Sequence, residues 1–395
     1  MISLAKCFCD DYLNVGKLKN FCDSHKLKKS ENKAELIRNI LEFAGNNSED
    51  IQYIETYNWI LQAIKDGTKD ICYKKIYYDD DTFNSIEQKI FNRFPSCPRT
   101  DILSYQNTKS FELVDYEIKM DDKGKLAMVS FLFSKLVLEG SISDEVGEES
   151  IYPVYIDLYI KEGFIVSRIK PKATIYEDSE NKMLYKENRI KTISSAVDLM
   201  DDIIKLFSLR QDLNFTRHKV RKMLFKLYNY YSVTPKEVED EIQKVKPITD
   251  EYVNKIFKVL ELNICNIPQA LQDLSIFLEK YVSINGDMEY IFKENREAYL
   301  IKISSDDASQ MTSFDAKSAM TKPLQCTDIF YDGKKSVLTT KECKKLNLCY
   351  NRHRGYLQAF PVQFSEMTTF GLIKMQYCPE EVDIQDVLQT VFRNY

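Results

Sequence analysis

The sequence predicts an α+β fold with a small N-terminal helical module, an antiparallel sheet region, a long-helix region and a C-terminal mixed α/β region. Apolar residues recur at helical spacing near the start. Long β-branched and aromatic segments separated by glycines follow, and amphipathic helical patterns come next, before strand patterns return. We place the four regions at residues 1–66, 67–185, 186–285 and 286–395.

The composition limits the classes of function. The 395 residues include 55 Lys+Arg and 60 Asp+Glu, a net charge of −5, so any nucleic-acid contact must be local. No apolar run approaches the about 20 residues that span a bilayer, and the start lacks a signal-peptide core. The ten cysteines are scattered without a CxxC pair, as is typical of reduced thiols. We therefore expect a cytoplasmic protein without membrane contact.

The first two regions follow from periodicity and glycine spacing. Leu18, Phe21, Leu36 and Ile40 mark two short helices, and a third helix starts after residues 45–48 and ends at Gly67. In the second region a helix at 83–94 ends before a proline. The expected strands of that region are 72–78, 111–120, 126–138, 152–160 and 164–176.

The third region opens with amphipathic helices at 192–209 and 215–231. Thr234 is expected to cap the next helix, with Pro235 at its first position and Glu237 closing a capping box. A further helix at 249–282 is expected to be interrupted near Pro268.

The fourth region returns to strands. They are expected at 290–292, 298–303 and 328–331 and as a hairpin within 356–377, before a short helix at 385–392. The polar, Ser-rich segment 304–322 is expected to be a loop.

Residues 12–43 resemble the SAP family of helix-extended-helix DNA-binding motifs. The family has an LK-containing first helix, a small hydrophobic residue in the link and a K-x-E-L-I-x-R second helix. The chain has Lys26 and Glu31 where the family often has glycine, and an acidic residue there weakens the approach to phosphate. The related LEM and Rho N-terminal folds share this topology, and some LEM-type modules bind protein. The matching residues are Val15, Leu18, Lys19, Phe21, Leu27, Ser30, Lys33, Ala34, Glu35, Leu36, Ile37, Arg38 and Ile40.

The resemblance implies DNA binding by this module, and its charge agrees. Seven basic against four acidic side chains between residues 12 and 44 give +3. Basic side chains beside a helix N-terminus can converge on a phosphate, in contacts that are salt-sensitive and largely blind to sequence. The candidate DNA-binding residues here are Lys17, Lys19, Lys28, Lys29, Lys33 and Arg38. A solvated lysine face on a small helical cap is the alternative.

A second basic cluster lies between residues 210 and 226, where six basic residues against one acidic residue give +5. Arg217 and Arg221 share a helix face, and Lys222 is next to them, so all three are candidate DNA contacts. Tyrosines follow at once, and basic and aromatic residues together suit single-stranded nucleic acid. The favoured alternative is a solvated helix face that pairs with the acidic residues of 237–241.

Catalysis has little support, and we expect neither a catalytic residue nor a metal or cofactor. The chain contains three histidines, far apart in sequence, and no nucleophile elbow, phosphate-binding glycine loop or HExxH. Asp157 and Glu162 faintly resemble nuclease carboxylates, but Phe164 occupies the place of the essential lysine. Cysteines 343 and 349 with His353, and Cys326 or Cys378 as a fourth ligand, match no common zinc spacing.

These observations predict a DNA-associated binding and assembly protein, with a SAP-like head that tethers an α+β body to DNA. By analogy, such heads occur in microbial defence and mobile-element systems. A protein partner or a homo-oligomer is expected. The alternatives are a divergent metal-dependent nuclease and a protein-interaction subunit that does not bind nucleic acid.

Overall fold

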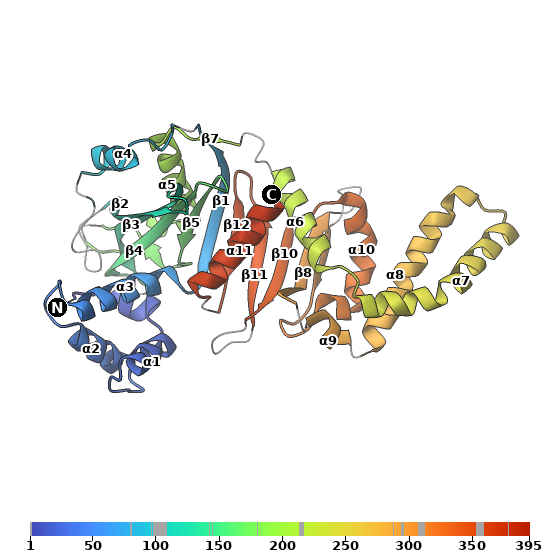
Figure 1. Ribbon diagram of the computed structural model, residues 1–395, viewed down its shortest axis with the longest axis horizontal. Coiled ribbons are helices and arrows are strands. Elements are labelled where there is room, and N and C mark those ends of the chain that lie inside the picture. Colours follow the sequence, from blue (N-terminus) through green and yellow to red (C-terminus); the bar gives the residue numbers. More distant parts are fainter. Residues whose placement is uncertain are drawn as a thin grey trace. The chain divides into compact units, whose positions relative to one another are not determined.

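The protein divides into two compact units in its computed structural model (Figure 1). The first comprises Met1–Leu213 and Lys374–Phe392, and the second comprises Asn214–Ile373 and Arg393–Tyr395. Helices and antiparallel strands together confirm the predicted α+β class. None of the described helices is both long enough and apolar enough to cross a membrane. The structure describes residues 2–79, 81–95, 97, 109–141, 143, 145–179, 181–212, 217–286, 288–293, 296–306, 313–352, 359–377 and 379–395.

The first unit begins with helices, as predicted. A π-helical turn, η1 (Phe8–Tyr12), precedes α1 (Val15–Ser24), α2 (Lys33–Ala44) and α3 (Ile51–Lys65). The side chains of Asn14 and Asn32 cap α1 and α2 by accepting from the backbone N–H groups of Lys17 and Ala34. The apolar residues at helical spacing form one buried cluster of Leu18, Phe21, Cys22, Leu36, Ile37 and Ile40, with Leu13 and Ala63.

An antiparallel sheet forms the body of the first unit, in the strand order β2-β3-β4-β5-β1. Two short strands pair at its margins, β6 (Ile175–Tyr176) with β3 and β7 (Arg210–Gln211) with β1. The predicted strand 164–176 is therefore two strands. The five long strands are β1 (Lys69–Tyr77), β2 (Glu112–Met120), β3 (Leu126–Glu139), β4 (Glu148–Tyr159) and β5 (Phe164–Ile169).

Helices cover both faces of this sheet. Side chains alternate between the faces of a strand, so Phe164 and Arg168 share one face. Both contact α11 (Glu381–Asn394), through Phe392 and Glu381. The opposite face meets α5 (Thr192–Leu206), where Lys74 pairs with Asp201 at 2.6 Å. A further helix, α4 (Ile86–Arg93), lies where a helix was predicted.

The strands of the second unit follow the order β12-β11-β10-β8-β9, and the last two residues of β12, Lys374 and Met375, belong to the first unit. The pairs β10–β11, β10–β8 and β8–β9 are antiparallel. The helix α6 (Arg217–Tyr231) directs Val220, Met223, Leu224 and Leu227 into the core. The strands are β8 (Ala298–Asp306), β9 (Ser313–Lys317), β10 (Lys345–Asn351), β11 (Ala359–Glu366) and β12 (Gly371–Met375).

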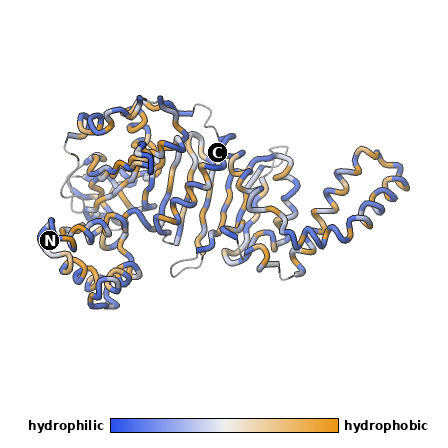
Figure 2. Tube along the Cα trace, viewed as in Figure 1, coloured by the Kyte–Doolittle hydropathy of each residue, from blue (hydrophilic) through white to orange (hydrophobic). Residues whose placement is uncertain are grey.

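A long helical hairpin completes the second unit (Figures 1 and 2). It consists of α7 (Lys236–Val259), the 3-10 turn η4 (Ile264–Asn266) and α8 (Ile267–Asn285). The predicted interruption near Pro268 is confirmed, because this proline lies in the first turn of α8. The predicted helix start at 249 is wrong, because α7 continues through Pro247.

Two predicted strands are helices. Residues 290–292 lie in α9 (Met288–Lys293), and residues 328–331 form the first turn of α10 (Asp328–Thr340). In α10, Phe330 and Val337 are buried seven residues apart, which is two helical turns. The apolar residues of 328–331 thus belong to a helical pattern of about 3.6 residues per turn. Four residues are too few to distinguish this pattern from the alternation of a strand.

Two local predictions are also corrected. Pro235, not Thr234, is the N-cap of α7, because the Thr234 hydroxyl donates to Glu279 at 2.9 Å instead of capping the helix. The predicted loop 304–322 contains the end of β8 and the whole of β9, and the turn η5 (Leu324–Cys326) follows it. Residues 307–312 lie outside the described part of the chain.

Candidate functional site

The link between α1 and α2 has the helix-extended-helix form without a glycine. The Leu27 N–H donates to the Cys22 carbonyl at 2.8 Å and the Lys26 N–H to the Asp23 carbonyl at 3.2 Å, which is a Schellman ending. Lys26 has φ 57°, the left-handed conformation that usually selects glycine. Lys26 therefore adopts a backbone conformation that favours glycine, and Leu27 turns back onto the apolar cluster of the module.

Three lysines of this link are exposed: Lys26, Lys28 and Lys29. Lys26 forms no ion pair with any described residue. Lys28 pairs with Glu35 at 3.2 Å and Lys29 pairs with Asp23, and their side chains are 79% and 58% exposed. Exposed ion pairs of this kind contribute at most about 1 kcal/mol, so a phosphate can replace either carboxylate. The link thus presents cationic groups on an extended backbone.

A carboxylate already occupies the N-terminus of α2. Glu35 accepts a hydrogen bond from the Ser30 hydroxyl at 2.7 Å, and Ser30 accepts from the Asn32 N–H. The hydrogen bonds from Ser30 and Lys28 lower the pKa of Glu35. An incoming phosphate must compete with this charge, so the link lysines are better placed than the helix N-terminus to bind it.

Two other candidate residues of the module, Lys17 and Lys19, are held by acidic side chains. Lys17 forms a poorly exposed ion pair with Asp66, the residue that also accepts from the Glu381 N–H at 2.6 Å. Lys19 makes two hydrogen bonds of 2.7 Å to Glu31.

Lys33 and Arg38 lie on α2. Lys33 donates to the Asp10 carbonyl at 3.0 Å. The Arg38 side chain is 65% exposed and lies 3.9 Å from Glu35 and 3.8 Å from Glu42, and such exposed ion pairs are weak. Of the six candidates in this module, the structure therefore leaves Lys28, Lys29 and Arg38 most accessible.

The second basic cluster is tied to the acidic groups of its own unit. Arg221 reaches Asp306 and Glu366 at 3.0 Å each and Glu342 at 3.7 Å. Arg217 pairs with Glu366 at 2.8 Å. These carboxylates replace the predicted partners at 237–241, and they lie too far along the chain for sequence spacing to identify them.

Lys222, the third candidate in that cluster, is exposed and forms no ion pair with the described residues. Burial acts to lower the pKa of Arg221, but Glu366 and Asp306 raise it overall. Arg221 therefore stays charged and is surrounded by the carboxylates of Asp306, Glu342 and Glu366. Of the three candidates in this cluster, only Lys222 is exposed without an ion pair to a described residue.

The nuclease interpretation depended on Asp157, which the structure places in the interior. Its Oδ2 lies 2.7 Å from Nε of Arg168, and its Oδ1 accepts from the Ser130 hydroxyl at 2.6 Å. Glu162 lies in the turn after β4, where its backbone carbonyl accepts from Lys75. No group of three or more metal-ligating side chains occurs among the described residues.

The zinc interpretation rests partly on residues outside the described chain, namely His353 and Cys378. Cys326, Cys343 and Cys349 are described and buried, and burial raises the pKa of both Cys343 and Cys349. Buried thiols with raised pKa values are poor ligands and poor nucleophiles.

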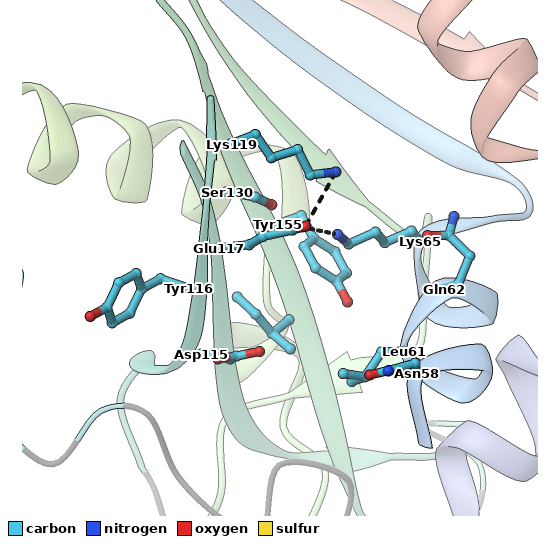
Figure 3. Close-up of a pocket in the computed structure, with 11 residues that line it drawn as sticks. Asn58, Leu61, Gln62, Lys65, Asp115, Tyr116, Glu117, Lys119, Ser130 and Tyr155 are labelled. Carbon is cyan, nitrogen blue, oxygen red and sulfur yellow. Dashed lines mark hydrogen bonds and ion pairs between the residues drawn. The ribbon is translucent and has the colours of Figure 1, made fainter. Parts of the chain in front are cut away.

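A polar cavity of about 450 Å³ lies between α3 and the strands β2, β3 and β4 (Figure 3). Figure 3 shows Asp115, Glu117 and Lys119 on the side of β2 that faces α3. Glu117 lies between Lys65 at 3.2 Å and Lys119 at 3.4 Å. The Lys65 ammonium also lies 5.5 Å from the centre of the Tyr155 ring.

The charges in this cavity are unevenly matched. Burial acts to raise the pKa of Glu117, but Lys65 and Lys119 lower it overall. Burial raises the pKa of Asp115, which has no such pair of lysines. The lining also includes Asn58, Gln62 and Tyr155. The cavity can hydrogen-bond a small polar molecule, but its lining contains no histidine, cysteine or paired base and nucleophile.

Comparison with protein-family models, with curated proteins and with solved structures found no match to this chain.

Proposed function

We propose that this is a DNA-associated binding and assembly protein that acts in the cytoplasm, with the N-terminal module as a tether. The observation that carries the proposal is the extended link, which exposes Lys26, Lys28 and Lys29 between two short helices. The rest of the chain is acidic on balance, with a net charge of −5 overall. A local cationic loop on an acidic protein directs nucleic acid to one place.

Contacts of this kind recognise the phosphate backbone and not the bases. Each lysine that neutralises a phosphate of duplex DNA contributes a slope of about −0.9 to the logarithm of affinity against the logarithm of salt concentration. Three link lysines predict a slope near −2.7, with Arg38 adding to it. We therefore expect weak, sequence-tolerant binding that falls steeply with salt.

The test is a salt series of duplex-DNA binding, with the wild-type protein and a variant in which Lys26, Lys28 and Lys29 become glutamate. The matched control reverses Lys123, Lys125 and Lys161, which are exposed lysines in turns of the same unit. We expect the link variant to lose binding at least tenfold and the control variant to lose less than threefold. Equal losses in both variants would show that only net charge matters.

The two alternatives give different results in the same assay. A protein-interaction subunit shows no DNA binding, or binding that salt leaves unchanged. A nuclease shortens the DNA when Mg²⁺ or Mn²⁺ is added, and the burial of Asp157 against Arg168 counts against this alternative. By analogy only, a DNA tether on a larger body fits a microbial defence or mobile-element protein.

A further inference from the structure

The helical hairpin of the second unit exposes large apolar side chains. Ile248, Tyr252 and Val259 of α7 are 67%, 60% and 79% exposed. Phe277 and Tyr281 of α8 are 52% and 48% exposed, and their rings lie 4.8 Å apart. Isolated exposed apolar residues need no explanation, but a contiguous patch indicates an interaction site.

Helix geometry places these five residues on one face of the hairpin. The spacings of four and seven residues in α7, and of four in α8, keep each set on one side of its helix. Tyr252 directly precedes the buried Val253, and Tyr281 directly precedes Val282, which packs in the same cluster as Ile242 of α7. On each helix the exposed residue therefore precedes a residue that packs between the helices by one position, which is a rotation of about 100° around the helix axis. Because the two helices run antiparallel, the same rotation brings both exposed sets to the same face of the hairpin.

The charges along α7 favour one arrangement of a partner. Residues 236–243 carry four acidic side chains and one lysine, whereas residues 244–259 carry four lysines and two acidic side chains. In an antiparallel arrangement about residue 250, Lys258 of each copy lies beside Glu241 of the other, at the two ends of the overlap between the helices. A parallel arrangement would set like charges together.

We propose that this face is the interface of a homodimer, in which two α7 helices pack antiparallel about a two-fold axis near residue 250. Ile248 of one copy then faces Tyr252 of the other, and Lys258 lies opposite Glu241. A self-complementary surface of this kind is what a two-fold interface requires.

The size of the hairpin suits such an interface. The 24 residues of α7 extend for about 36 Å. Two adjacent helices, each about 10 Å wide, give a face of about 700 Å² per copy, and the total of about 1,400 Å² is typical of stable interfaces. The inference does not depend on the proposed DNA binding, although a dimer would present two link regions to one duplex.

The first experiment measures the mass in solution by light scattering or sedimentation across a range of protein concentrations. We expect twice the monomer mass for the full chain, and the monomer mass for Tyr252→Glu. The control is Tyr230→Glu, which makes the same change at an exposed tyrosine of α6. Far-UV circular dichroism should be unchanged for both variants. A monomeric wild type, or a dimer that tolerates both Tyr252→Glu and Phe277→Glu, overturns the proposal.

The second experiment tests the antiparallel orientation by oxidative crosslinking. Cys265 is exposed at the end of the hairpin and lies 15 residues from the proposed axis. Two such cysteines would then be about 45 Å apart, whereas a disulfide needs Cα atoms within about 7 Å. We expect little Cys265 crosslinking in the wild type and rapid crosslinking of Ile248→Cys in a Cys265→Ser background. Rapid dimer crosslinking through Cys265 alone would overturn the antiparallel arrangement.

Discussion

Arg168 and Asp157 form an ion pair inside the sheet of the first unit, on the adjacent strands β5 and β4. Nε of Arg168 lies 2.7 Å from Oδ2 of Asp157, and the two side chains are 1% and 0% exposed. Glu381 of α11 adds a second carboxylate at 2.5 Å. Burial alone lowers the pKa of Arg168, but Asp157 and Glu381 together raise it, so the arginine stays charged. The pair therefore joins two strands and the C-terminal helix.

Asp157→Asn should destabilise the protein by about 3–5 kcal/mol, because it leaves a buried guanidinium with one carboxylate in place of two. Urea unfolding of the first unit measures the change. The double variant Asp157→Asn with Arg168→Met should recover part of the loss, because it removes the charge that the single variant leaves uncompensated. A single variant as stable as wild type would contradict this role of the pair.

Lys26→Gly should stabilise the N-terminal module by about 0.5–1 kcal/mol, because glycine adopts φ 57° without a clash of Cβ. Asn20→Gly, on the exposed side of α1, is the control and should be destabilising. Thermal unfolding distinguishes the two. The same Lys26→Gly variant should reduce the salt slope of DNA binding by about 0.9, since one cation is lost. A loss of stability in Lys26→Gly would show that the turn is not strained.

Lys69 should make stability depend on pH above neutrality. Burial, with Arg168 nearby, lowers its pKa to about 7 from 10.5, and its neutral amine still donates to the carbonyls of Ile64 and Asp66. Between these two pH values the unfolded chain binds more protons at this site, so the contribution of Lys69 to stability rises with pH from 7 to 10.5.

Lys69→Met should flatten that rise, whereas Lys161→Met, at an exposed turn, should leave it in place. Chemical unfolding at pH 7, 8.5 and 10 gives the slope for each variant. Equal slopes in wild type and Lys69→Met would contradict the lowered pKa.

Gly333 should not accept a methyl group. An added Cβ there would overlap the ring of Phe314, which packs on α10 from β9. We expect Gly333→Ala to cost about 1–3 kcal/mol by overpacking. In a Phe314→Ala background the same change should become neutral or stabilising, because alanine favours a helix interior by about 1 kcal/mol over glycine. A double-mutant cycle measures the coupling, and additive effects would contradict the contact.

The helices and strands that the sequence predicted well are those whose period extends over several turns or several alternations. Leu18 and Phe21, or Leu36 and Ile40, are buried at the expected spacing. The predicted start of a new helix at 249 was wrong because α7 continues through Pro247, which lies on the exposed side of that helix. Water can solvate the carbonyl that loses its N–H partner there, so the helix continues.

The sequence predicted only those features of the candidate site that depend on residues close together in the chain. The exposed link between α1 and α2 follows from local pattern. The partners of Arg221 do not, because Asp306 and Glu366 lie 85 and 145 residues away along the chain. The acidic residues nearest in sequence were therefore the natural but incorrect choice. The cavity beneath α3 likewise draws on strands far from that helix in sequence.

The first unit is synthesised in two parts, which are separated in the chain by most of the second unit. Residues 374–392 belong to the first unit but follow residues 214–373 of the second. At usual rates of translation the 160 residues from 214 to 373 take roughly 8–32 s. During that time Arg168 lacks its ion pair with Glu381, and Phe164 lacks its contact with Phe392. The apolar surface that α11 later covers stays exposed, so chaperones can bind it or the chain can misfold. A truncation of the last twenty residues therefore damages the half of the protein that is made first.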